Sequence, residues 1–393
     1  MTKTLFHNFS LFDGKNTENE ANAWFVVEDG KLVDRGTGNT PNADETVNLD
    51  GRFVMPGLFN VHSHLTSHPD KFDGGFDTSE AESAYYALHH LRQLLKSGVT
   101  YVRECGDAYD TDIKLKRLQA AGVLKHVPEL QPSGKAMSMT GGHGDGPHMA
   151  YLTDSPDEMR KAFRTALKNG ARVIKMMATG GVMTPGDFMD DPQLSVEEMR
   201  TGVVEAHHKG IRAAAHAEGN PGIQNALDAG VDSLEHGFYI NEAECRQALK
   251  QETVITPTLI AEMNIPKYGK GVLPEWEIKK AEDALDDTYA NFKRTHEMGV
   301  LFTLGTDAGT PFNGFDQTPV EFEYLKRVGM TPAEAFQCST LNSPKLCDVA
   351  DDHGTLEVGK YADFLVLHND PLQDVRAVQQ VDKEMYLRGN REF

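Results

Sequence analysis

The chain has 393 residues, 39% of them hydrophobic, and a formal net charge of −20. A charge this acidic argues against nucleic acid or an anionic membrane surface as a partner. No apolar stretch reaches the roughly 18 residues that a membrane-spanning helix needs, and the N-terminus lacks the apolar segment of a secretory signal. Four cysteines without metal-binding spacing (Cys105, Cys245, Cys338 and Cys347) predict free thiols in a reducing cytoplasm.

Residues 1–56 contain short apolar runs that are typical of β-strands, at 5–9, 23–27 and 31–33. Asp-Gly pairs, which are strong hairpin signals between apolar runs, separate the candidate strands. They stand at Asp13-Gly14, Asp29-Gly30 and Asp50-Gly51. This part of the chain predicts a small β unit.

Residues 57–352 alternate short apolar runs with amphipathic stretches of helical length. The predicted strands are 58–62, 99–105, 130–137, 173–178, 211–216, 233–236, 254–259 and 301–306, and the clearest helices are 82–96 and 195–209. Ser195 followed by Glu198 has the spacing of a capping box. Repeated strand–helix units predict a distorted (β/α)8 TIM barrel, in which Pro132 and Gly134 make the third strand the weakest.

Residues 353–393 return to β character, in the runs 361–367 and 384–387. Because both ends of the chain are β-rich, we expect 1–56 and 353–393 to pair into one composite β-sandwich domain. The predicted fold class is therefore α/β, with a barrel over 57–352 beside this small β-sandwich.

Titratable side chains stand at the ends of five predicted barrel strands: His62 and His64, then Lys175, His216, His236 and Asp307. Barrel enzymes keep their sites at the carboxyl ends of strands, and imidazole is a common zinc ligand. Each residue alone has a plain structural alternative: solvated or core histidines, a buried lysine paired with an acid, and a helix cap. Their coincidence on five strands favours a metal site.

The chain resembles the amidohydrolase superfamily over nearly its whole length. The motifs that carry the resemblance are PGLFNVHSH (56–64), VIKMMATGG (173–181), AAAHAEG (213–219), SLEHG (233–237), GTDAG (305–309) and GTLEVGKYADFLVL (354–367). The sequences IKMMATGG and TGGHG (140–144) are most similar to the prolidase-like and carboxypeptidase-like branch, which is related to the imidazolonepropionases.

The resemblance implies two divalent metal ions, with Zn2+ expected and Mn2+, Co2+ or Fe2+ as alternatives. His62 and His64 would bind the more buried ion, and His216 and His236 the second. Lys175, carboxylated by CO2, would bridge the two. The resemblance gives Asp307 the roles of ligand and general base, and it gives His143 that of polarising the scissile carbonyl.

Three residues are candidates for binding the substrate: His143 in a glycine-rich loop, Tyr239 just after His236, and Arg103 at the end of the second strand. They could hold a substrate carboxylate, although Arg103 could equally form a structural salt bridge. We expect five other histidines, in loops or helices, to be solvated: His68, His89, His90, His207 and His208.

The expected function is hydrolysis of an amide bond in a small-molecule substrate, either an Xaa-Pro-like dipeptide or an N-acyl amino acid, by a cytoplasmic homo-oligomer. Alternatives are cyclic-amide hydrolysis or deamination of the imidazolonepropionase type, and lactone, ester or phosphotriester hydrolysis. The resemblance implies that deaminases of this superfamily commonly use one metal and lack the lysine of the fourth strand, so the presence of Lys175 argues against deamination. A non-catalytic scaffold is disfavoured because all six ligand positions are filled.

Overall fold

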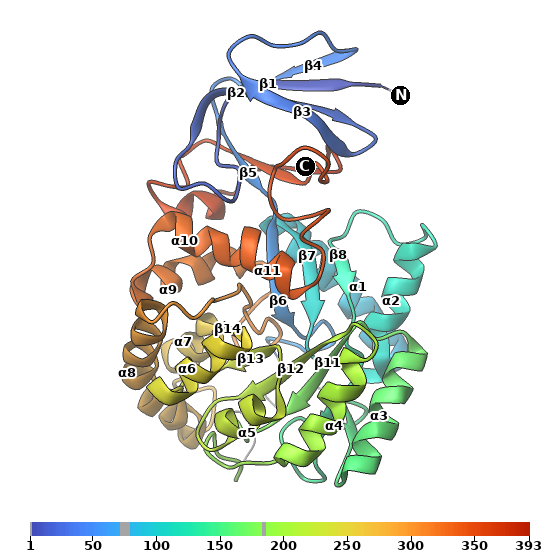
Figure 1. Ribbon diagram of the computed structural model, residues 1–393, viewed down its shortest axis with the longest axis vertical. Helices are drawn as coiled ribbons and strands as arrows, with labels where there is room; N and C mark the ends of the chain where they lie inside the picture. The colour runs from blue at the N-terminus through green and yellow to red at the C-terminus, as the bar shows by residue number, and fades with distance from the viewer. Residues whose placement is uncertain (1, 71–78, 183–185) are drawn as a thin grey trace.

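The computed structural model describes residues 2–70, 79–182 and 186–393, and Figure 1 shows both termini in a β-rich unit at one end of a larger α/β body. Its strands are β1 Thr4–Leu11, β2 Glu20–Glu28, β3 Lys31–Thr37, β4 Glu45–Asn48, β5 Phe53–Pro56, β6 Leu58–Ser63, β7 Val99–Glu104, β8 Glu129–Gln131, β9 Ala136–Ser138, β10 Ala150–Leu152, β11 Val173–Met177, β12 Arg212–Ala217, β13 Ser233–His236, β14 Val254–Thr256, β15 Phe364–Leu367, β16 Glu384–Leu387 and β17 Asn390–Arg391. Its α-helices are α1 Glu80–Ser97, α2 Thr111–Ala120, α3 Pro156–Asn169, α4 Val196–His207, α5 Gly222–Ala229, α6 Glu242–Gln251, α7 Leu259–Tyr268, α8 Glu275–Glu297, α9 Glu321–Val328, α10 Pro332–Gln337 and α11 Ser343–Leu346.

The terminal strands form one hydrogen-bonded sheet in the order β17-β16-β15-β5-β1-β2-β3, with β4 beside β1. The two chain ends therefore share a sheet, as the sequence predicts, and β15 joins them by pairing antiparallel to β5. Of the three Asp-Gly pairs, Asp29-Gly30 forms the expected hairpin between β2 and β3, with both residues at positive φ. The hairpins expected at Asp13-Gly14 and Asp50-Gly51 are wrong: the first lies in the longer loop between β1 and β2, and β4 and β5 both run parallel to β1.

Alternate residues of β15 enter different apolar cores, because successive side chains of a strand point to opposite faces. Phe364 and Val366 pack with Phe6, Phe25 and other residues of the terminal sheet. Leu365 and Leu367 belong to the large core of the α/β body. The terminal sheet is thus anchored on the body by one of its faces. Its folding into a two-layered sandwich and the domain boundaries stay predictions.

The body contains two parallel sheets, ordered β6-β7-β8 and β9-β11-β12-β13-β14 with β10 beside β9. Five of the predicted strands are confirmed within about one residue, as β6, β7, β11, β12 and β13. The segment 130–137 gives two short strands, β8 and β9, because Pro132 cannot donate to a ladder and Gly134 adopts a φ of +69°.

The strands predicted at 254–259 and 301–306 differ from the structure. The first ends at Thr256 and helix α7 begins at Leu259. The second forms no named strand, but the Ile255 amide donates to the Leu301 carbonyl at 3.0 Å and the Val61 amide donates to the Leu304 carbonyl at 2.8 Å. Residues 301–306 therefore run between β14 and β6. Closure of all the strands into one barrel stays a prediction.

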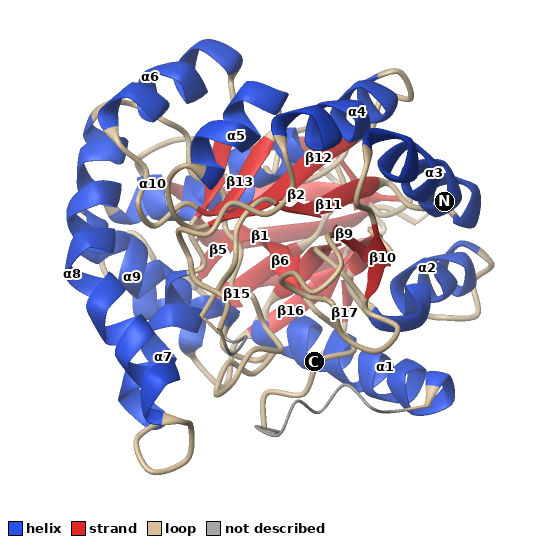
Figure 2. Ribbon diagram, turned by 90° about the horizontal axis from the view of Figure 1, so that it is seen from below, coloured by secondary structure: helices blue, strands red, loops and turns tan. Residues whose placement is uncertain are grey.

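Helices surround the parallel strands of the body, as Figure 2 shows. The predicted helices 82–96 and 195–209 are confirmed as α1 and α4. The Ser195 side chain accepts from the Glu198 amide in the predicted capping box, and Ser79 with Glu82 caps α1 in the same way. The candidate site lies at the carboxyl ends of the strands.

Candidate metal centre and active site

Six residues reach the candidate site from the carboxyl ends of different segments. His62 belongs to β6 and His64 follows it, Lys175 belongs to β11, His216 to β12 and His236 to β13, and Asp307 follows segment 301–306. The Asp307 amide donates to the His62 carbonyl at 2.9 Å, which ties this last segment to β6. His236 and Asp307 have φ values of +72° and +60°. Such strained backbone in non-glycine residues often marks a functional site.

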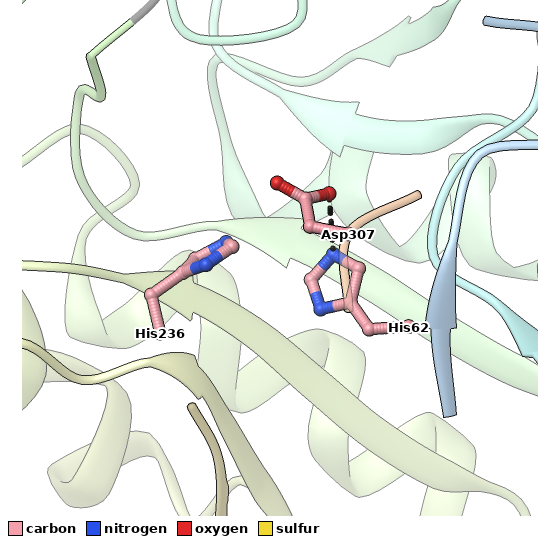
Figure 3. Close-up of side chains that lie close together, drawn as sticks. All are labelled: His62, His236 and Asp307. Carbon is pink, nitrogen blue, oxygen red and sulfur yellow. Dashed lines mark ion pairs between the residues drawn. The ribbon is translucent and has the colours of Figure 1, made fainter. Parts of the chain in front are cut away.

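The side chains of this set converge, and Figure 3 shows three of them, His62, His236 and Asp307. The Oδ1 atom of Asp307 lies 3.3 Å from His62 Nε2 and 3.0 Å from His64 Nε2. Lys175 Nζ lies 3.2 Å from His62 Nε2. The His236 ring is centred 5.0 Å from that of His62 and 4.6 Å from that of His216. The structure therefore brings together all six residues that the sequence predicts.

Three of these imidazoles are held through Nδ1. His62 Nδ1 lies 2.8 Å from a Glu235 oxygen, His64 Nδ1 lies 2.8 Å from the Gly106 carbonyl, and His236 Nδ1 lies 2.7 Å from the Thr258 hydroxyl. Fixing Nδ1 orients the ring and leaves Nε2 for another partner, as is usual for histidines that bind metals. His216 differs, because its Nε2 atom contacts the Gly180 carbonyl at 3.0 Å.

Burial lowers the pKa of His62, His216 and His236 well below the usual range, so these imidazoles are neutral at pH 7. Neutral imidazole is the form that donates a lone pair to a metal. Burial alone would raise the pKa of Asp307, but His62, His64 and the Lys175 charge hold it below its usual value. The site therefore combines neutral nitrogen donors with an ionised carboxylate.

The donor set fits a divalent metal ion. His62, His236 and Asp307 each offer one ligand atom, and these atoms lie within 4.8 Å of one another. Cys105 also lies near His62, but burial raises the pKa of its thiol to about 12, so it stays protonated and is a poor ligand. A site of nitrogen and oxygen donors suits zinc and tolerates other first-row divalent ions.

A cavity of about 240 Å³ opens beside this cluster. Its lining includes five of the six predicted metal ligands, while His62 is fully buried. His143 also lines it; its ring stacks on His216 with centroids 4.2 Å apart, and its Nδ1 atom lies 3.2 Å from Asp187. His143 is thus beside the candidate metal centre, as the sequence predicts.

Two of the predicted substrate-binding residues do not belong to the described lining of this cavity. Arg103 is 1% exposed, and its guanidinium donates to Glu235 at 2.8 Å and to the Val61 carbonyl at 2.6 Å. The structure therefore corrects its proposed role: it forms the structural salt bridge that was the alternative. Tyr239 is partly buried, and the described lining of the cavity includes the neighbouring Phe238 but not Tyr239.

Two histidines that were predicted to be solvated are buried, and three acids without a predicted role line the cavity. His68 and His90 are buried, and His68 lines the cavity, whereas His89, His207 and His208 are exposed as expected. The missed acids are Glu218, Glu262 and Glu277, which also line the cavity. Only Glu218 carried a sequence signal, because it lies two residues after His216; the helical positions of the other two gave none.

Among the residues that the structure describes, no helix combines the length and apolar character needed to cross a membrane.

A profile of the amidohydrolase family matches residues 53–386. Ochratoxinase of Aspergillus niger is 30% identical over 360 residues, covering 83% of this chain and 72% of that protein. Imidazolonepropionase of Fusobacterium nucleatum subsp. nucleatum is 26% identical over 88% of this chain and 85% of that protein.

Among solved structures, a Xaa-Pro dipeptidase with bound methionine superposes with a TM-score of 0.91 at 29% identity, over 99% of both chains. The profile match covers most of the sequence, and the six strand-end residues occupy one site. The chain therefore belongs to the amidohydrolase family and is a hydrolase of the class that acts on carbon–nitrogen bonds.

Proposed function

We propose that this protein is a binuclear metal-dependent amidohydrolase that cleaves the amide bond of an Xaa-Pro-like dipeptide or an N-acyl amino acid. The observation that carries the proposal is the convergence of His62, His64, Lys175, His216, His236 and Asp307 beside one cavity. These residues would hold two divalent ions, with Zn2+ as the first choice. We also propose that the protein is cytoplasmic and forms a homo-oligomer. Four buried free cysteines support the cytoplasmic location, because free thiols are typical of a reducing compartment.

The surroundings of Lys175 support carboxylation of its amine. Lys175 is 2% exposed, and among the described residues no carboxylate lies within salt-bridge distance of Nζ. A bare ammonium is costly to bury without such a partner. After loss of a proton, the Lys175 amine could add CO2 and release a second proton to solvent, which would give a carbamate anion that could serve as a metal ligand.

The bound ions would act as Lewis acids that polarise the scissile carbonyl and lower the pKa of water. Asp307, which is ionised and beside His62 and His64, would accept a proton from the attacking water. It would then pass this proton to the amine nitrogen as the carbon–nitrogen bond breaks, which yields a carboxylate and an amine. Asp187 fixes the His143 ring through Nδ1, which leaves Nε2 to contact the substrate carbonyl oxygen.

The likeness to a Xaa-Pro dipeptidase supports a dipeptide as the substrate, and the match to an imidazolonepropionase favours a cyclic amide as the second candidate. The test is a screen of dipeptides, N-acyl amino acids and cyclic amides with protein loaded with Zn2+, Co2+ or Mn2+. Elemental analysis should find two ions per chain, and a chelator should abolish turnover until metal is restored. Full activity in demetallated protein would contradict the proposal.

A further inference from the structure

The cavity contains carboxyl groups that the proposed metal chemistry does not use. Glu218 follows β12, Glu262 lies on α7 and Glu277 lies on α8, and their exposed fractions are 5%, 3% and 6%. All three line the cavity beside Asp307. Three acids from three elements thus meet next to the reaction centre, although acids are rarely buried without a partner.

Two of these cavity-lining carboxyls each carry one unsatisfied oxygen. Glu218 Oε2 and Glu262 Oε1 are buried and have no hydrogen-bond partner among the described protein groups. Burial raises the pKa of Glu262 to about 8, so this carboxyl is largely protonated at pH 7, and an entering cation would favour its ionised form. Unpaired buried acceptors cost free energy, so a donor that enters the cavity would be favoured there.

The nearby cations of the protein have other contacts. The Lys280 ammonium donates to the backbone carbonyls of Gly181 and Asp187, and Arg103 is committed to Glu235. A bound cation could therefore stabilise the ionised form of these carboxyls. The rest of the lining is largely apolar, with Phe238, Ile265 and Leu273 among it, and would suit the carbon chain of such a ligand.

We propose that the cavity recognises a substrate that carries a cationic nitrogen, an ammonium or guanidinium group, held by Glu218 and Glu262. This inference rests on the proposed amide hydrolysis and narrows its substrate class. The cation could be the α-ammonium of a free dipeptide or the end of a basic side chain. Both would supply the donors that Glu218 Oε2 and Glu262 Oε1 lack.

Matched substrates separate these two sources. Nα-acetyl-lysine and Nα-acetyl-norleucine differ only in a side-chain ammonium. Alanyl-norleucine and N-acetyl-alanyl-norleucine differ in that a neutral acetamide replaces the α-ammonium, so cleavage is measured at the Ala–norleucine bond in both. We expect kcat/KM to favour the cationic member of at least one pair by about tenfold or more, because a buried carboxylate discriminates strongly against a ligand that leaves it unpaired. Glu262→Gln should remove most of this preference, whereas the exposed control Glu242→Gln should keep it.

Calorimetry gives a readout that does not need turnover. It compares the binding of lysine and norleucine to the zinc-loaded protein, and the binding of alanyl-norleucine and its N-acetyl form to the zinc-loaded Asp307→Asn protein. Tighter binding of the cationic member of either pair supports the inference even if Glu262→Gln fails to fold. Equal kcat/KM and equal binding within both pairs would overturn it. A third metal ion per chain, lost in Glu218→Gln, would also overturn it, because Glu218 lies near His216 and His236 and would then be a ligand. If the metal-loaded protein hydrolyses no amide, the proposed function is contradicted. Calorimetry then shows separately whether the cavity prefers a ligand with a cationic nitrogen.

Discussion

Replacing Arg103 with methionine tests whether this buried cation supports the metal centre or recognises substrate. The guanidinium donates to Glu235 Oε1 at 2.8 Å and to the Val61 carbonyl at 2.6 Å, and the other Glu235 oxygen lies 2.8 Å from His62 Nδ1. Removing one partner of a buried ion pair costs about 3–5 kcal/mol, because it leaves an uncompensated charge. Arg103→Met should therefore destabilise the protein by this amount.

The same substitution should weaken metal binding, because Glu235 would no longer be fixed beside His62. Loss of such supporting partners typically costs about 10–100-fold in metal affinity. Urea unfolding of the metal-loaded protein measures the first effect, and competition with a chelator measures the second. The exposed Arg246→Met is the matched control and should change neither.

A double substitution gives the sharpest check of this reasoning. Arg103→Met with Glu235→Met removes both charges, so its destabilisation should be smaller than the sum of the two single effects. The reasoning would be refuted if Arg103→Met kept the stability and metal content of the wild type while selectively losing substrates that carry a carboxylate. That result would restore the substrate-binding role predicted from the sequence.

Three further predictions concern other buried groups. Lys175→Ala should lose metal and activity, with partial rescue by short carboxylic acids; a structure with both metals bound to an unmodified Lys175 amine would contradict this. Asp307→Asn should keep metal but lower kcat by about 10²–10⁴, which steady-state kinetics with elemental analysis can check. Burial lowers the pKa of His90 to about 4, so folding stability should fall as pH falls from about 6.5 to 4 and the unfolded chain takes up the proton. His90→Gln should remove up to about 3 kcal/mol of this pH dependence in unfolding experiments, and the exposed control His89→Gln should leave it intact.

Local sequence patterns were enough to predict the features that depend on a few neighbouring residues. Apolar runs located β6, β11, β12 and β13, and their ends located His62, His64, Lys175, His216 and His236. Ser195 and Glu198 marked the start of α4, and Asp29-Gly30 marked a hairpin. Strand periodicity, capping and tight turns are set by local sterics and hydrogen bonds, so a short stretch of sequence suffices to indicate them.

Which distant groups share an environment depends instead on how the whole chain packs. Arg103 pairs with Glu235, which lies 132 positions along the chain, and this contact turned a predicted substrate residue into a support for His62. Glu262 and Glu277 reach the cavity from two helices, and nothing near them in the sequence indicates burial. The pairing and burial of a side chain depend on how separate strands and helices pack, which no local pattern records.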